Sequence, residues 1–121
     1  NDGAADLQEA CTCDGTPLYR HVARQAATWS AEAEGTAGLV AGATAPEALA
    51  ELRADAPTLP FLVPGVGAQG GEPAEVMDAA ATDDGPVLVN SSRSIIYASE
   101  EADYADAAAE AARDLRDALR S

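Results

Sequence analysis

Lysine is absent from this chain of 121 residues, although arginine occurs seven times. The absence excludes chemistry that needs a lysine within the chain: a Schiff base, a lysine acid or the lysine of a phosphate-binding P-loop. Aromatic residues make up only 4% of the sequence, so its core must be built from small side chains. No apolar run approaches the ~18 residues of a membrane span, and no signal-peptide pattern opens the chain.

Positive charge is scarce, because 7 basic residues face 21 acidic ones and leave a formal net charge of −14. This balance disfavours nucleic acid and anionic membranes as partners. The acids are spread along the chain, and a hydrophobic content of 47% argues for a folded domain rather than an acidic tail. A lysine-free, acidic composition is typical of a halophilic, cytoplasmic protein, since high salt screens self-repulsion. An acidic bias in a GC-rich genome is the alternative.

Cysteine is limited to Cys11 and Cys13, separated by one residue. A zinc site normally needs four ligands, and the only other soft ligand in the chain is His21. Two reduced cytoplasmic thiols are therefore favoured over a metal site. No nucleophile or base is visibly paired with His21, which we interpret as a surface residue.

Predicted helices alternate with short apolar strands. Strands are expected over 38–43, 60–63 and 86–89, and helices after Thr16–Pro17, after Thr44, from Glu72–Pro73 and over about 101–119. The alternation predicts an α/β fold with parallel strands and helical crossovers. Three such units match the C-terminal portion of a (β/α)8 TIM barrel, whose full length is ~250 residues. The continuously apolar run 38–43 is expected to be buried on both faces.

Local signals give more detailed expectations for the helices. Thr16 is predicted to cap the first helix, with Pro17 at its first position. Thr44 and Glu47 fit a capping box, in which each side chain bonds a backbone N–H of the other residue. Trp29 and Met77 fall on apolar stripes and are expected in the core.

A glycine-rich loop over 64–71 follows the second predicted strand and precedes a helix. Its four glycines let a backbone approach a ligand, and Gln69 adds an amide donor and an acceptor. A tight strand-to-helix turn is the structural alternative. Residues 65–70 also match G-x-G-x-x-G literally, but no acid-tipped second strand follows, so a dinucleotide site is not indicated.

A second polar segment, 90–94, follows the third predicted strand. Three serines flank Arg93, whose guanidinium suits a bidentate phosphate contact. A surface arginine paired with one of the many acids is an equally good interpretation of this segment alone. Together with the glycine loop one unit earlier, the segment lies where barrel enzymes hold phosphate, after strands seven and eight.

Three motifs in order carry a resemblance to a known family: 42–47 (GATAPE), 64–71 (PGVGAQGG) and 90–97 (NSSRSIIY). The chain resembles the orotidine 5′-phosphate decarboxylases, of the longer bacterial-type branch, in the C-terminal part of their barrel. Its opening residues 1–8 (NDGAADLQ) are similar to the loop after the fifth strand of that branch. The resemblance covers essentially the whole chain.

The resemblance implies an enzyme that converts orotidine 5′-monophosphate to uridine 5′-monophosphate and CO2 in pyrimidine synthesis. It implies no cofactor and no metal, and a homodimer of barrels. The implied site residues share contact with the substrate: Gln69, Arg93 and backbone N–H groups near Gly67 and Ser92 at the phosphate, and Pro64 and Val66 lining the pocket near the base.

One departure from the family is clear. Its chemistry rests on a lysine–aspartate network in a D-x-K-x-x-D pattern, which a chain without lysine cannot contain. We therefore expect 1–121 to be the C-terminal half of one barrel domain, inactive alone and with no catalytic residue of its own. Asn1 in place of an initiator Met fits a processed chain or a fragment. The alternatives are a non-catalytic phosphate- or nucleotide-binding half-barrel and another phosphate-binding barrel enzyme, which the coding sequence before Asn1 would distinguish.

Overall fold

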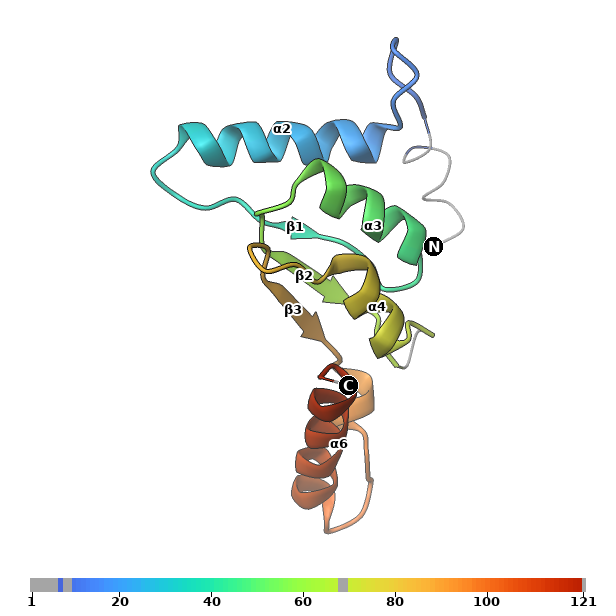
Figure 1. The fold of residues 1–121 in the computed structure, drawn as a ribbon. Helices are drawn as coiled ribbons and strands as arrows, with labels where there is room; N and C mark the ends of the chain where they lie inside the picture. Colours follow the sequence, from blue (N-terminus) through green and yellow to red (C-terminus); the bar gives the residue numbers. More distant parts are fainter. Residues whose placement is uncertain (1–6, 8–9, 68–69, 121) are drawn as a thin grey trace.

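The computed structural model describes residue 7, residues 10–67 and residues 70–120. Helices and strands alternate along these residues (Figure 1). Their order is α2 (Leu18–Glu32), β1 (Leu39–Val40), α3 (Pro46–Asp55), β2 (Phe61–Pro64), α4 (Pro73–Ala80), β3 (Val87–Asn90), α5 (Arg93–Ile96) and α6 (Tyr104–Ala118). None of the helices in the described part of the chain combines the length and apolarity of a membrane span.

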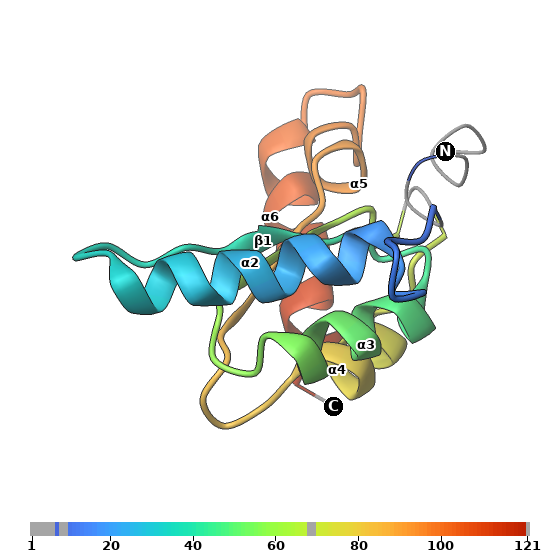
Figure 2. The ribbon, with the colours of Figure 1, turned by 90° about the horizontal axis from the view of Figure 1, so that it is seen from above.

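The strands form one parallel sheet, as the alternation predicted, and their order in it is β1-β2-β3. Leu39 pairs with Phe61, and Phe61 pairs with Val87, so each strand lies beside the next one along the chain. Figures 1 and 2 show α2 lying across α3, and α6 extending beyond the end of β3. The expected α/β fold with parallel strands and helical crossovers is confirmed.

The hydrophobic core lies on the helix-covered face of the sheet. Phe61 and Val63 of β2 are fully buried there against Leu49 of α3 and Val76 of α4. The opposite face carries Val40, Leu62 and Leu88, which are paired in register and 73%, 42% and 56% exposed. The prediction that the first strand is buried on both faces is therefore wrong. Its apolar composition suits two covered faces, but the described helices cover one.

The two predicted helix caps are also wrong. The N-cap of α2 is Pro17 rather than Thr16, and no side chain bonds the first turn. The N-cap of α3 is Ala45, again without a side-chain bond. Pro46 takes the first helical position, which leaves Thr44 one residue too early for a capping box.

Two core predictions differ in outcome. Met77 is half-buried, whereas Trp29 is 58% exposed. Helix α2 buries the small side chains of Ala23 and Ala26, so the larger indole lies beside that contact rather than within it. The prediction of a core position is therefore wrong for Trp29.

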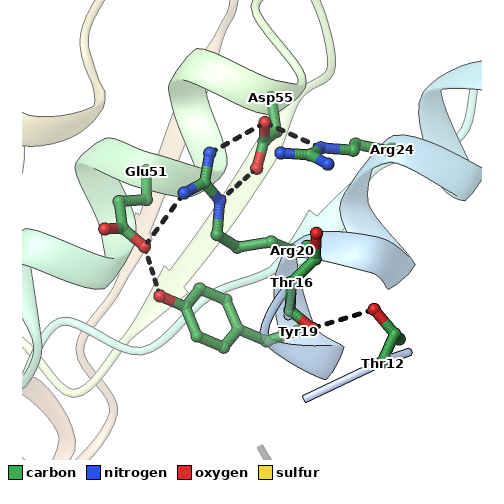
Figure 3. Close-up of polar contacts among 7 residues, drawn as sticks. All are labelled: Thr12, Thr16, Tyr19, Arg20, Arg24, Glu51 and Asp55. Atoms are coloured by element: carbon green, nitrogen blue, oxygen red, sulfur yellow. Dashed lines mark hydrogen bonds and ion pairs between the residues drawn. The ribbon is translucent and has the colours of Figure 1, made fainter. Parts of the chain in front are cut away.

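Polar contacts also join α2 to α3 (Figure 3). Arg20 donates from Nε to Asp55 Oδ2 at 2.6 Å, and Arg24 donates from Nε to Asp55 Oδ1 at 3.0 Å. The Tyr19 hydroxyl donates to Glu51, and this bond raises the pKa of Tyr19 to about 12. The guanidinium of Arg20 is the main cause that holds the pKa of Asp55 below its ordinary value. These contacts tie α2 to α3.

Candidate phosphate-binding site

The two predicted ligand loops lie side by side because they follow neighbouring parallel strands. Pro64, the last residue of β2, is paired with Asn90, the last residue of β3. The glycine loop therefore begins next to the segment that carries Arg93. Parallel strands bring their carboxyl ends to one edge of the sheet, which is where α/β proteins place their ligands.

A pocket of about 90 Å³ opens between these loops. Ligand sites for whole small molecules typically span ~300–1,000 Å³, so this pocket fits one group of a ligand. Its lining comes from both loops: Pro64, Gly65, Val66, Asn90, Ser91, Ser92 and Arg93. Four of the residues singled out in the sequence thus meet here, namely Pro64, Val66, Ser92 and Arg93.

Three glycines of the loop have backbone angles that a residue with a side chain would adopt only with strain. Gly65, Gly67 and Gly70 have φ values of 98°, 80° and 91°, in the left-handed region that favours glycine. Gly67 donates its N–H to Gly71 O at 2.9 Å, and Gly71 donates to Gly65 O at 3.3 Å. These bonds close the loop on itself. Gln69, the predicted phosphate and pyrimidine contact, lies outside the described residues.

Arg93 is the cationic group of the pocket. Its side chain is exposed at the start of α5, and none of the ion pairs among the described residues involves it. By contrast, Arg20, Arg24 and Arg116 each face a carboxylate. The guanidinium of Arg93 is thus exposed and outside the ion pairs among the described residues, as are those of Arg113 and Arg120.

Two structurally important residues were not identified from the sequence. Ser91 lines the pocket and donates to Val66 O at 3.1 Å, across the two loops. The serines beside Arg93 were visible in the sequence, but the sequence did not indicate which of them would bond the glycine loop. Arg53, a residue of α3, is buried. No local pattern distinguishes it from an exposed helical arginine, because two of its carbonyl partners, Ala80 and Gly85, lie 27 and 32 residues away.

The remaining chemistry-bearing residues lie away from the pocket. His21 is exposed on α2, as expected, and the thiol residues Cys11 and Cys13 are exposed before that helix. Within the ranges that the structure describes, no group of three or more histidine, cysteine, aspartate and glutamate side chains could hold a metal ion.

The arrangement of βα units with a pocket at the carboxyl ends of the strands is that of part of an α/β barrel. A family model for the orotidine 5′-phosphate decarboxylase / HUMPS family matches residues 1–109. The chain belongs to this family, and the resemblance noted in the sequence is confirmed.

Similar sequences carry the same name. The chain is 50% identical to an orotidine 5′-phosphate decarboxylase of Paracidovorax citrulli over 125 residues, covering 100% of this chain and 45% of that protein. It is 49% identical to an orotidine 5′-phosphate decarboxylase of Halobacterium salinarum over 122 residues, covering 98% of this chain and 45% of that protein. The chain therefore spans less than half the length of these relatives.

A solved structure agrees with the fold. The OMP decarboxylase of Leishmania donovani superposes with a TM-score of 0.78 at 39% identity, covering 100% of this chain and 46% of that one. The expectation that the three βα units form a portion of a (β/α)8 barrel is thus confirmed.

Proposed function

We propose that this chain is the C-terminal half of one (β/α)8 barrel domain of an orotidine 5′-phosphate decarboxylase. The whole protein would convert orotidine 5′-monophosphate to uridine 5′-monophosphate and CO2. The observation that carries the proposal is the pocket between the loops after β2 and β3, where Arg93 has no carboxylate partner among the described residues. Membership of the decarboxylase family supports the substrate.

In this proposal the chain supplies binding energy rather than the reacting groups. Arg93 would grip the substrate phosphate, and backbone N–H groups near Gly67 and Ser92 would complete its cradle. Gln69 would contact the phosphate and the pyrimidine, while Pro64 and Val66 would line the pocket near the base. Phosphate binding far from the reacting carbon can be used to organise the closed active site.

The carbanion chemistry would come from a lysine–aspartate network outside these 121 residues, since the chain holds no lysine. That network would protonate the carbon left by CO2 and stabilise its developing charge. Neither a cofactor nor a metal enters the proposed reaction. The 121-residue chain alone should therefore release no CO2 from orotidine 5′-monophosphate. Measurable turnover by the pure chain would contradict the assignment of the reacting groups to residues outside it.

The phosphate role is tested by Arg93→Ala in the complete protein. Loss of a desolvated charge contact should raise KM by a factor equivalent to about 2–5 kcal/mol. Arg113→Ala is the matched control, because Arg113 is an exposed arginine on α6, away from the pocket. An unchanged KM in Arg93→Ala would contradict the assignment.

We also propose a cytoplasmic, halophilic homodimer that binds neither nucleic acid nor membranes. The support is the net charge of −14, which salt would screen and which repels polyanions. Denaturation of the complete protein at increasing KCl should show a rising free energy of unfolding. A flat or falling dependence would favour the acidic-genome alternative, and sedimentation would test the dimer.

A further inference from the structure

We propose that Ser91 and Ser94 are positioning residues that hold Val66 and Gly67 of the glycine loop against the segment carrying Arg93. The inference rests on the proposed function, because it concerns the same phosphate pocket. It adds a physical link between two loops that lie next to one another but belong to different βα units.

The link consists of two hydroxyl contacts. Ser91 Oγ lies 3.1 Å from Val66 O and 3.2 Å from Ser94 Oγ. A hydroxyl carries one proton and two acceptor lone pairs. Ser91 can therefore donate to the Val66 carbonyl while it accepts the proton of Ser94. In this arrangement both serines take part in one chain that ends on the glycine loop.

A second contact brings the same loop onto Ser94. A Cβ atom placed on Gly67 would lie 3.0 Å from Ser94 Oγ and 3.8 Å from Ser91 Oγ. The loop backbone thus passes against both hydroxyls, and its close approach depends on a glycine whose φ is 80°. Val66 and Gly67 are consecutive, so the two contacts hold one short stretch of the loop.

The position of the link in the sheet explains its use. The β2–β3 ladder ends at the Pro64–Asn90 pair, immediately before both loops. The hydroxyl link continues the connection beyond this pair, from Ser91, one residue after Asn90, to Val66, two residues after Pro64. On its other side the loop is packed against Ala43, because a Cβ on Gly71 would lie 2.5 Å from Ala43 Cβ. Gly67 and Gly71 therefore pack against the segments that follow β3 and β1, respectively.

Positioning differs from direct contact with substrate in a way that can be measured. Ser91 lines the pocket, so its loss could act through a missing ligand contact. A positioning role, however, must also be visible without substrate. The amide protons of Gly67 and Gly71 report on it, since both are bonded within the loop in the structure.

The experiment compares Ser91→Ala, Ser91→Thr and Ser99→Ala in the complete protein. Ser99 is the matched control, because its hydroxyl bonds Asp103 outside the pocket. In Ser91→Ala without substrate, hydrogen exchange at Gly67 and Gly71 should be about 3- to 10-fold faster, the size of one neutral hydrogen bond. KM should rise by a similar factor with kcat little changed. In Ser91→Thr, which keeps a hydroxyl, the exchange rates and KM should return to those of the parent protein.

Unchanged exchange at Gly67 and Gly71 in Ser91→Ala would overturn the inference, as would an equal effect of Ser99→Ala. Exchange at Leu49, which lies in α3, should not change, and a change there would show general unfolding and count against a positioning role. Failure of the proposed function is seen separately, as an unchanged KM in Arg93→Ala. In that case the exchange result still decides whether the serines hold the loop.

Discussion

The guanidinium carbon of Arg53 lies 3.7 Å from the centroid of the Phe61 ring, so a charged group of α3 stacks on the central strand of the sheet. Arg53 is 5% exposed, and burial lowers its pKa. The charge is compensated by carbonyl groups, to which its N–H groups donate: Ala56, Pro57, Leu59, Ala80 and Gly85. These groups come from the end of α3, the end of α4 and the starts of β2 and β3.

The first prediction concerns this carbonyl cluster. Arg53→Lys keeps the charge but replaces a planar set of donors with a single ammonium, which cannot reach all of these carbonyls. Several buried carbonyls then lose a charged partner, so the free energy of unfolding should fall by about 3 kcal/mol or more. Urea denaturation of the complete protein measures the loss. Arg113→Lys on α6 should change stability by less than about 0.5 kcal/mol, and similar values for both variants would contradict the role of Arg53.

The second prediction concerns the fit of Gly71 against Ala43, in the segment that follows β1. In Gly71→Ala the new methyl group would lie 2.5 Å from Ala43 Cβ and 3.1 Å from Gly65 O, so one of the two segments must move. We expect a lower free energy of unfolding, by about 1–3 kcal/mol, and a weaker phosphate pocket. Gly42→Ala is the control, since nothing lies within 4 Å of its added Cβ. Equal stability of the two variants would show that the loop is not packed as described.

The third prediction concerns acid stability and the Asp55 carboxylate. Arg20, followed by Arg24, lowers the pKa of Asp55 below its ordinary value of 3.8 in the folded chain. The unfolded chain therefore binds this proton first as the pH falls, so the contribution is complete above about pH 5 and is lost as the pH falls through the folded-state pKa. Asp55→Asn should be less stable than the parent protein at neutral pH, and this difference should shrink below pH 3.8.

Denaturation at a series of pH values checks this sign. Asp83→Asn is a suitable comparison, because Asp83 is exposed in the turn before β3 and belongs to none of the ion pairs among the described residues. A difference between parent and Asp55→Asn that stays constant from neutral to acidic pH would contradict the ion-pair explanation.

The parallel direction of the strands and the adjacency of the two loops were predictable because they follow from local patterns. Short apolar runs separated by helical spacing require parallel strands, and parallel strands bring 64–71 and 90–94 to one edge. Burial was less predictable, because Val40 and Leu39 are both apolar and only the packed structure distinguishes their faces. Arg53 depends on carbonyls up to 32 residues away, and no local pattern carries that information. The Thr44 cap failed because Pro46 takes the first position of α3, and the Thr16 cap failed because Pro17 is the N-cap of α2.

The consecutive strand order has a consequence for assembly. Leu39 pairs with Phe61 and Phe61 with Val87, so each pairing closes a loop of 61 − 39 = 22 or 87 − 61 = 26 residues. Such short closures have similar entropic costs, which favours folding by stepwise addition of βα units. The pocket is lined from both β2 and β3 loops, so it exists only after the third strand has docked. A phosphate that occupies this pocket would therefore bind only chains in which β3 has docked, and its binding would stabilise that edge of the folded sheet.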